Sequence, residues 1–385
     1  MEFSLNTEQK MLKQNAATFL KKEIASKVDE YDRLYPFPKE LAHELLKKII
    51  PLGYIDGPIP TGSGGQGLDF LSWGIMMEEL GKVWASLALM VGNQVVTAYD
   101  LAIRGTEEQK KEFLFPVMAA NKIACFAGTE PDAGSDDRSI RTSAVLDNDN
   151  YIINGTKVWV SNGTFADIAC VTAVTNKSKG QKEISLIIVD KERSPFKVRP
   201  LPKLGLHAST SAELSFEDCH VPQRYLFGES GIGPQKAISW DIWRCINSTI
   251  SVGIAQAACE ASIEYARERH QFGRPIGSFQ LIQESIVDMV TRVQAARLMT
   301  YRVWFLLDKG ERCRGEAAMA KAFANEIAMD VTSKAIEIHG SYGISEEFPL
   351  ERYYRDARTI VFLDGTIEIM KLIAGREILG LSAII

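Results

Sequence analysis

The hydrophobic pattern of the chain changes twice, and these two changes constrain the fold more than any other feature. Up to about residue 120, apolar residues recur at three- and four-residue steps, the spacing of one face of an α-helix. Near Asn121, short runs rich in Val, Ile and Thr replace this spacing, and past Gly228 the helical spacing returns. The sequence therefore predicts an α+β protein with an N-terminal helical domain (1–120), a middle antiparallel β domain (121–228) and a C-terminal helical domain (229–385).

The secondary-structure elements inside these domains follow from the same patterns. Asn154-Gly155 is a two-residue hairpin signal, and the polar runs at 147–150 and 176–180 are typical of turns. Gly310 and Gly340 stand where helix ends favour a left-handed residue. We expect helices over 7–28, 41–49, 69–102, 107–120, 234–270, 278–308 and 315–339, a last helix from Asp364 or Thr366, and strands over 168–174, 184–189 and 212–216.

Composition excludes several classes of protein. A chain of 385 residues with 46% apolar and 24% charged residues is globular and too long for one core. Its formal charge of −5 gives no general attraction to nucleic acid or to an anionic membrane. We expect no signal peptide and no membrane-spanning helix, because no run of about 18 uncharged apolar residues occurs. The six cysteines form no C-x-x-C pair, which favours reduced thiols in the cytoplasm over disulfides or a metal site.

One short motif is misleading. The run Gly62-Ser63-Gly64-Gly65-Gln66-Gly67 matches G-x-G-x-x-G, the pattern of dinucleotide-binding loops. That function needs a strand directly before the glycines and an acidic residue about 20 positions later. Pro58 and Pro60 interrupt any such strand, and no acidic residue stands at that distance. We therefore predict a connecting loop here.

Two stretches of the middle domain carry hydroxyls, backbone donors and an aromatic face, which suit a planar polar cofactor. They are Phe126-Ala127-Gly128-Thr129-Glu130-Pro131-Asp132-Ala133-Gly134-Ser135-Asp136 and Asn154-Gly155-Thr156-Lys157-Val158-Trp159-Val160-Ser161-Asn162. Both closely resemble the flavin-contacting strands of the acyl-CoA dehydrogenase family. The resemblance returns at 267–276, 339–343 and 355–358, in the family's order, so it covers nearly the whole chain.

The resemblance implies the family's architecture, with a four-helix bundle as the last domain, and its cofactor, FAD. It also implies the family reaction on an acyl-CoA. A carboxylate base removes the proton next to the thioester carbonyl, and hydride passes from the neighbouring carbon to flavin N5. The positions matched to cofactor contacts are Phe126, Gly128, Thr129, Ser135, Trp159, Ser161, Arg269, Phe272, Gln280, Glu337, Gly340, Ser341, Thr366 and Glu368.

The matched positions imply different roles. Trp159 would stack on the flavin ring, although a lone Trp in a strand is more often a core residue. Ser135 would hold flavin or the pantetheine arm of the substrate. Arg269, with Phe272 and Gln280, would reach the diphosphate half of FAD in a neighbouring subunit, since an arginine fork suits a diphosphate. The alternative is a solvated helix end.

The sequence departs from the family pattern around residue 340. Glu337 stands where members commonly have Gln, and Ser341 stands where they have a second Gly. A carboxylate near a diphosphate is repelled, so Glu337 either points away or binds a hydroxyl. Ser341 restricts a backbone position that is usually unrestricted.

The most informative departure is Asp364, directly before Gly365-Thr366, where most members carry the Glu that acts as base. Its alternative role is the N-cap of the last helix. Some members of the family carry the base instead on the helix that corresponds to the one through Trp243. This chain has a tryptophan at that position, which cannot act as a base. Nearby, Asp241 and Arg244 match substrate-binding positions, with a solvated charge pair as the alternative.

Asp reaches about 1.5 Å less far than Glu, and proton abstraction does not tolerate such a gap unless the substrate comes closer. Two interpretations follow. A branched or alicyclic α-carbon, such as that of cyclohexane-1-carboxyl-CoA, presents its proton to the shorter arm. Otherwise, the base has been demoted, and another carboxylate removes a more distant proton from an already unsaturated acyl group.

The resemblance also implies partners. Electrons would pass to an electron-transferring flavoprotein, and shared FAD sites require a homo-oligomer, a tetramer in most of the family. Two other functions stay open: a flavin-dependent acyl-CoA oxidase that uses oxygen, and a non-catalytic acyl-thioester-binding protein that has lost its base. The carrier of the thioester, CoA or an acyl carrier protein, is also open.

Overall fold

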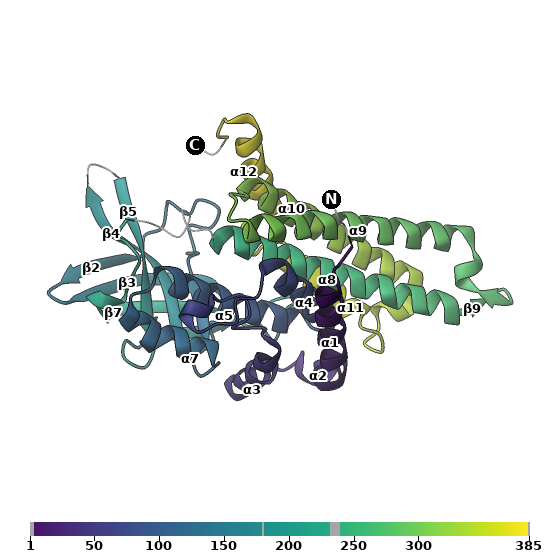
Figure 1. Cartoon of the computed structure of the whole chain (residues 1–385), viewed down its shortest axis with the longest axis horizontal. Coiled ribbons are helices and arrows are strands. Elements are labelled where there is room, and N and C mark those ends of the chain that lie inside the picture. The colour runs from purple at the N-terminus through teal and green to yellow at the C-terminus, as the bar shows by residue number, and fades with distance from the viewer. Residues whose placement is uncertain (1–3, 179–180, 232–238, 384–385) are drawn as a thin grey trace.

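The computed structural model describes residues 4–178, 181–231 and 239–383. Figure 1 shows an elongated molecule with the β domain at one end and a long helical bundle at the other. The N-terminal helices lie between them along one side of the molecule (Figure 1). Helices, a sheet and further helices follow one another along the chain, which confirms the predicted fold class.

The N-terminal domain is helical as predicted. Its first helix begins with a capping box, in which the Asn6 side chain accepts from Gln9 N (2.8 Å) and the Gln9 side chain accepts from Asn6 N (3.1 Å). The 107–120 segment is less regular than expected, because a π-helical turn at Lys110–Leu114 separates two short helices. The helices are α1 (Thr7–Glu23), α2 (Ala25–Tyr31), α3 (Lys39–Ile49), α4 (Phe70–Val83), α5 (Ala85–Arg104), α6 (Glu107–Gln109) and α7 (Phe115–Met118).

The glycine-rich run 62–67 begins inside the short 3-10 turn Thr61–Ser63, and no strand directly precedes it in the described part of the chain. The segment is therefore a connecting loop, as predicted.

Helix α5 is the one helix among the described residues that is long and apolar enough to cross a membrane. However, 83% of the apolar window of α5 is buried inside the protein, so its length and composition fit a core helix.

The β domain is a single sheet with strand order β6-β7-β3-β2-β4-β5-β8, and β1 pairs with β4 off this path. The pairings are antiparallel except that β1 and β2 each run parallel to β4, which the sequence pattern did not indicate. Side chains from both faces of the sheet and from α5 form its core. The strands are β1 (Ala124–Ala127), β2 (Ser143–Asp147), β3 (Asn150–Ser161), β4 (Ile168–Ser178), β5 (Gln181–Asp190), β6 (Lys197–Leu201), β7 (Ser211–Pro222) and β8 (Leu226–Phe227).

The predicted hairpin at Asn154-Gly155 is wrong. Both residues lie inside β3, where the register against β7 shifts between Ile153 and Gly155. Gly155 has φ +151°, and a Cβ there would lie 2.7 Å from Thr142 Cα. The glycine therefore serves a β-bulge with a close backbone approach. The real hairpin joins β2 and β3 through the predicted turn at 147–150. In the other predicted turn, residues 176–178 belong to β4 and 179–180 lie outside the described residues.

The C-terminal domain is a bundle in which α10 contacts every other long helix. Gly310 (φ +66°) and Gly340 (φ +61°) follow the ends of two of these helices, as predicted. The sequence analysis missed one helix, α11. The helices are α8 (Ser239–Glu268), α9 (Gln280–Asp308), α10 (Arg314–His339), α11 (Leu350–Ile360) and α12 (Ile367–Leu379), and the small strands β9 (His270–Gln271) and β10 (Arg274–Pro275) lie between α8 and α9.

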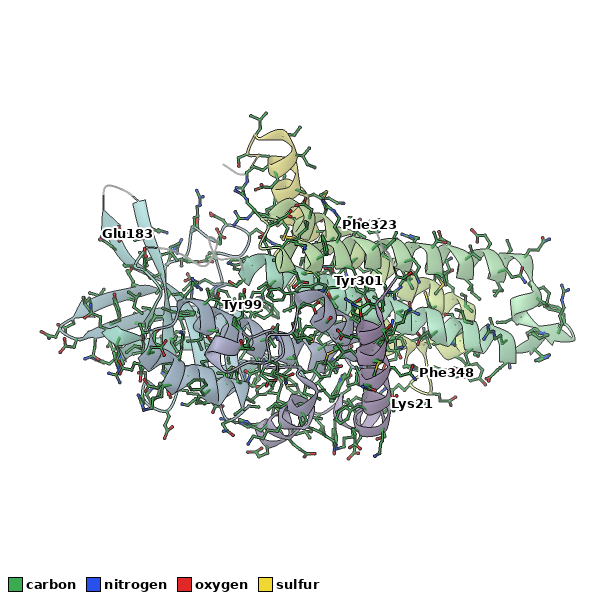
Figure 2. The ribbon with its side chains drawn as sticks, in the orientation of Figure 1. Lys21, Tyr99, Glu183, Tyr301, Phe323 and Phe348 are labelled. Atoms are coloured by element: carbon green, nitrogen blue, oxygen red, sulfur yellow. The ribbon has the colours of Figure 1, made fainter. Side chains whose placement is uncertain are left out.

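The three parts of the fold are tied together by buried contacts. Arg355 of α11 donates to Asp32 of the N-terminal domain (2.6 Å), and its neighbour Asp356 accepts from Leu206 N in the β domain (2.6 Å). Tyr99 of α5 packs against both large hydrophobic cores, and Figure 2 shows it where the N-terminal helices meet the sheet. These contacts fix the position of the β domain against the bundle, where the predicted site residues lie.

Candidate active site

The two stretches of the β domain singled out in the sequence lie side by side. Val158 N donates to Thr129 O (2.9 Å), and Lys157 Nζ donates to Gly128 O (3.0 Å). The loop after β1 is therefore fastened to β3 at two consecutive residues.

A buried ion pair supports this junction. The Lys157 side chain is fully buried, and its Nζ donates to Glu130 Oε1 (2.8 Å) and Thr172 Oγ1 (3.1 Å). Burial lowers the pKa of Lys157, and Glu130 opposes that effect. The Glu130 carboxylate also accepts from Arg141 N (2.7 Å) and Thr142 N (2.9 Å). Because both charges are paired and hydrogen-bonded, the pair can hold the two stretches in a fixed geometry.

Trp159 presents its ring outside the core of the sheet. Its φ is +59°, and the register against β7 shifts between Lys157 and Val160. The indole is 59% exposed, whereas its neighbours Val158 and Val160 are buried. A bulge that turns a side chain out of the sheet is a typical feature next to functional sites. The alternative, that Trp159 is a core aromatic, is therefore wrong.

The other matched residues of the β domain surround the same junction. Phe126 on β1 makes an edge contact with Trp240 of α8, with ring centroids 5.8 Å apart. Gly128 and Thr129 follow β1 directly, Ser161 ends β3, and Ser135 is exposed in the loop between β1 and β2. Phe126 thus links this junction to α8, while Thr129, Ser135 and Ser161 carry hydroxyls on the two joined stretches.

The residues matched to the diphosphate half of FAD lie elsewhere. Arg269 follows the end of α8, Phe272 lies between β9 and β10, and Gln280 begins α9. Figure 1 places β9 at the far tip of the bundle, opposite the β domain. Phe272 is 92% exposed at φ +53°. One chain therefore does not bring this group together with Trp159.

The departures near residue 340 are at the C-terminal end of α10. Glu337 is exposed and forms an ion pair with Lys334 one turn earlier on the same helix. Gly340 has φ +61°, and Ser341 follows it as an exposed residue. Lys334 thus pairs with the carboxylate of Glu337 on the surface of α10.

Asp364 is in the loop between α11 and α12, at φ +54°, and Gly365 follows it at φ +97°. The N-cap of α12 is Thr366, whose side chain accepts from Ile369 N (3.3 Å). Glu368 is exposed in the first turn of α12. The alternative role of Asp364 as the helix cap is therefore wrong, and its carboxyl is left for another use.

The surroundings of Asp364 are typical of a base. Its Oδ2 atom is buried and has no hydrogen-bond partner in the described part of the chain. Burial raises the pKa of Asp364 to about 6, while the charges of Lys321 and Arg244 and the amide of Asn247 limit the rise. A carboxyl with a pKa near the working pH is suited to general base catalysis.

The predicted pair of Asp241 and Arg244 is buried, so the alternative of a solvated charge pair is wrong. The two side chains lie one turn apart on α8, with Arg244 Nη1 3.1 Å from Asp241 Oδ1. Burial lowers the pKa of Arg244 and raises that of Asp241, and each partner opposes the effect on the other. Helix α8 thus brings one cation to the side of Asp364.

Sequence reasoning missed Lys321 of α10, whose Nζ donates to Gly365 O at 2.6 Å. A signal was present, because this lysine falls on the alanine-rich face of α10, where its helical neighbours Ala317, Ala318 and Ala324 are buried. A lysine at a core position of a helix needs a partner. Asn247, one turn after Trp243, was also missed and has no comparable sequence signal.

A hollow lies between α5, the β domain and the start of α8. Its lining includes Thr97, Phe126, Phe227, Trp240 and Trp243. Trp243 occupies the position that other members of the resembled family use for their base, and its ring limits the space beside α5. The hollow thus has a wall of aromatic side chains, and neither Asp364 nor Lys321 is among its lining residues.

Comparison with known proteins identifies the class that this fold and site define. The family models for the N-terminal, middle and C-terminal domains of acyl-CoA dehydrogenases match residues 6–121, 125–219 and 241–379. The chain belongs to the acyl-CoA dehydrogenase family, whose members are oxidoreductases acting on the CH–CH group of acyl-CoA.

Individual relatives cover the whole chain. It is 39% identical to the Probable acyl-CoA dehydrogenase YngJ of Bacillus subtilis, over 98% of this chain and 100% of the relative. The solved butyryl-CoA dehydrogenase from Megasphaera elsdenii is 35% identical with a TM-score of 0.93, over 98% of this chain and 100% of that chain. A glutaryl-CoA dehydrogenase from Mycobacterium smegmatis in complex with FADH2 is 25% identical with a TM-score of 0.90, over 99% and 97% of the two chains.

The cofactor of this family is FAD, and the residues present fit it. Trp159 offers a bare indole face on a bulged strand, which is the feature that a stacked tricyclic ring would cover. Thr129 and Ser161 place hydroxyls on the two segments beside this ring. When bound, FAD supplies the acceptor for the hydride that leaves the substrate.

Proposed function

We propose that the protein desaturates a short branched or alicyclic acyl-CoA between Cα and Cβ, with cyclohexane-1-carboxyl-CoA or its cyclohexene analogue as candidate substrates. The observation that carries this proposal is the carboxyl of Asp364, which is buried, takes no part in capping α12 and has no hydrogen-bond partner for Oδ2 among the described residues. A desolvated carboxyl with a perturbed pKa and nearby charge partners is a candidate for proton transfer.

In this mechanism Asp364 takes the α-proton while the thioester carbonyl accepts the electron pair as an enolate. Lys321 and Arg244 favour the ionised form of Asp364 before the transfer, since both lower its pKa. Abstraction needs the proton within hydrogen-bond reach of the carboxylate. A branched or ring α-carbon suits the shorter arm of Asp because it brings its proton nearer to the loop.

Trp243 supports the restriction to short acyl groups. Its ring is 8% exposed and fills space between α8 and α5 on the wall of the hollow. A long straight chain would have to displace this ring.

The residues matched to FAD contacts, from Phe126 to Glu368, are proposed to act as the resemblance implies. Asp241, Arg244 and Ser135 are proposed to contact the substrate.

The two groups of cofactor residues support a homo-oligomer, which we propose is a tetramer built from dimers that share FAD sites. Trp159 and Arg269 lie at opposite ends of one chain, so a second copy has to supply one group to the other. We further propose that the reduced flavin passes its electrons to an electron-transferring flavoprotein in the cytoplasm.

The test is anaerobic titration of the purified yellow protein with cyclohexane-1-carboxyl-CoA, its cyclohexene analogue, isobutyryl-CoA, butyryl-CoA and hexanoyl-CoA. We expect the branched and cyclic thioesters to bleach the flavin absorption fastest. Preference for butyryl-CoA or hexanoyl-CoA would overturn the assignment of the acyl group. Reoxidation of the bleached enzyme by air within seconds would favour the oxidase, and absence of bleaching by every thioester would favour the non-catalytic binding protein.

A further inference from the structure

Lys321 lies in the first half of α10 and is fully buried. Around it, α10 carries small side chains, and Ala318 and Ala322 form a small core with Met370, Ile373 and Ala374 of α12. The lysine thus lies where α10 supports the loop and helix that follow Asp364. A methionine or leucine would fill this apolar position at no electrostatic cost, whereas a buried ammonium costs free energy unless it is paired.

The hydrogen bond of Lys321 goes to the residue next to the proposed base. Its Nζ donates to Gly365 O at 2.6 Å. Asp364 and Gly365 both have left-handed backbone angles, which cost free energy for a non-glycine residue. The hydrogen bond from Lys321 holds this turn on one side, and the Thr366 cap of α12 holds it on the other. The direction of the Asp364 side chain therefore depends on the lysine.

The charge of Lys321 also acts on Asp364. Burial raises the pKa of Asp364, and Lys321 is the strongest of the groups that oppose the rise, followed by Arg244 and Asn247. Arg244 is already engaged by Asp241 at 3.1 Å. Burial lowers the pKa of Lys321 to about 8, with Asp364 opposing and Arg244 adding to that change. Below pH 8 the ammonium is therefore charged while Asp364 titrates.

We propose that Lys321 is a positioning residue for the reaction: it fixes the 364–366 turn through Gly365 O and keeps the Asp364 carboxylate ionised for removal of the α-proton. This inference rests on the proposed function of Asp364 as the base. It assigns to α10 a part in catalysis that does not require contact with the substrate or the cofactor.

The test separates the hydrogen bond of Lys321 from its charge. Lys321→Gln keeps a donor for Gly365 O without the charge, and Lys321→Met removes both. Lys371→Met is the matched control, because Lys371 also links α12 to α10, through Glu326, but is 62% exposed. For each protein, the rate of anaerobic flavin bleaching by cyclohexane-1-carboxyl-CoA and by butyryl-CoA is measured from pH 5 to pH 7.5. Deuterium incorporation at Cα in D2O is followed by mass spectrometry as a readout that does not depend on the final electron acceptor.

We expect the bleaching rates of Lys321→Gln and Lys321→Met to reach half of their plateau at a pH about one unit higher than in the wild type, with either thioester. The reason is that loss of a nearby positive charge raises the pKa of a carboxyl. Lys321→Met should also lower the plateau rate by about tenfold or more, since the turn loses its anchor. The control should follow the wild-type profile. Flavin content and melting temperature of each variant show whether it is folded.

Unshifted midpoints in folded Lys321→Gln would overturn the role of the charge, and an unchanged plateau in folded Lys321→Met would overturn the role of the anchor. If Lys321→Met does not fold, Lys321→Gln decides the question alone. Asp364→Asn tests the proposed function separately: deuterium incorporation at the wild-type rate in this variant would show that another group is the base, whatever the lysine variants do.

Discussion

The ring of Trp243 on α8 lies against Gly92 on α5, with its Cζ3 atom 3.5 Å from the position that a Cβ on Gly92 would occupy. A methyl group at position 92 would lie at ordinary contact distance from the indole but would crowd Ile246, whose Cγ2 atom is 3.1 Å from the same position. The ring of Trp243 is 8% exposed and lines the hollow between α5, the β domain and the start of α8. The contact thus fixes the position of Trp243 on the wall of this hollow.

We predict that Trp243→Leu widens the range of substrates toward longer chains. A hydrophobic pocket discriminates by about tenfold or more for each methylene that it can or cannot hold. The ratio of kcat/KM for hexanoyl-CoA to that for isobutyryl-CoA should therefore rise by about tenfold in the variant. Gly92→Ala should leave this ratio close to the wild-type value, because the added methyl group would lie at ordinary contact distance from Trp243 (3.5 Å) and would crowd Ile246 instead (3.1 Å). An unchanged ratio in Trp243→Leu would show that the ring does not limit the acyl group.

The activity should depend on the ionisation of Asp364. Because burial raises the pKa of this carboxyl to about 6, the fraction of active, ionised base increases as the pH rises through that value. The predicted kcat/KM therefore climbs with pH, has its midpoint near pH 6 and levels off above pH 7. Asp364→Asn should lower kcat by about two to four orders of magnitude, which is the usual contribution of a general base.

Asp364→Glu tests the argument from side-chain length. The longer arm restores the reach that most of the family has, so this variant should keep a base but change its preference toward straight-chain thioesters. Relative rates for butyryl-CoA and cyclohexane-1-carboxyl-CoA measure the change. Equal relative rates in wild type and variant would mean that the length of the arm does not select the substrate.

The outcome for Asp364 shows what the sequence could and could not predict. The motif Asp364-Gly365-Thr366 is compatible with a cap and with a base, and only the structure shows that the Thr366 side chain takes the cap. Local spacing cannot predict the other half of the site, because Lys321 stands 44 residues before Gly365, whose carbonyl it contacts. Helix periodicity, in contrast, predicted the long bundle helices well, since it depends on neighbours within one helix.

The misassigned hairpin has a related cause. Asn154-Gly155 has the composition of a tight turn, but tertiary contact decided its conformation, because the backbone of Thr142 on the neighbouring segment leaves no room for a side chain at 155. The assignment of this stretch to the cofactor site stays a prediction. Its composition suggested a turn, whereas partners distant in the sequence determined its geometry.

We predict that Lys157→Met destabilises the protein strongly. The substitution leaves the Glu130 carboxylate buried without its cation, which typically costs about 3–5 kcal/mol. Urea unfolding should show this loss, together with weaker flavin retention, because Thr129 and Trp159 are on the two segments that the pair joins. The double variant Lys157→Met/Glu130→Gln should recover part of the stability, because the uncompensated charge is removed.

A surface ion pair of the same domain provides the control for this experiment. Lys197 pairs with Glu217, but both side chains are well exposed, 74% and 68%. Exposed pairs contribute about 0–1 kcal/mol. The urea concentration at the midpoint of unfolding should therefore be nearly the same for Lys197→Met as for the wild type. A loss for Lys157→Met as small as that for the control would contradict the role given to the buried pair.

The separation of Trp159 from Arg269 leads to a prediction about assembly. If each FAD site takes Trp159 from one chain and Arg269 from a second copy, Trp159→Ala and Arg269→Ala homo-oligomers should both retain little flavin. Co-expression of the two variants, each with its own affinity tag, gives mixed oligomers in which one kind of shared site is intact and the other carries both changes. Tandem purification should therefore recover flavin in about half of the shared sites of a mixed dimer.

Arg269→Ala co-expressed with Phe272→Ala is the control, because both changes lie in the same group and leave no site intact. Recovery of flavin in this control as well, or its absence from the first mixture, would show that the site is not shared in this way.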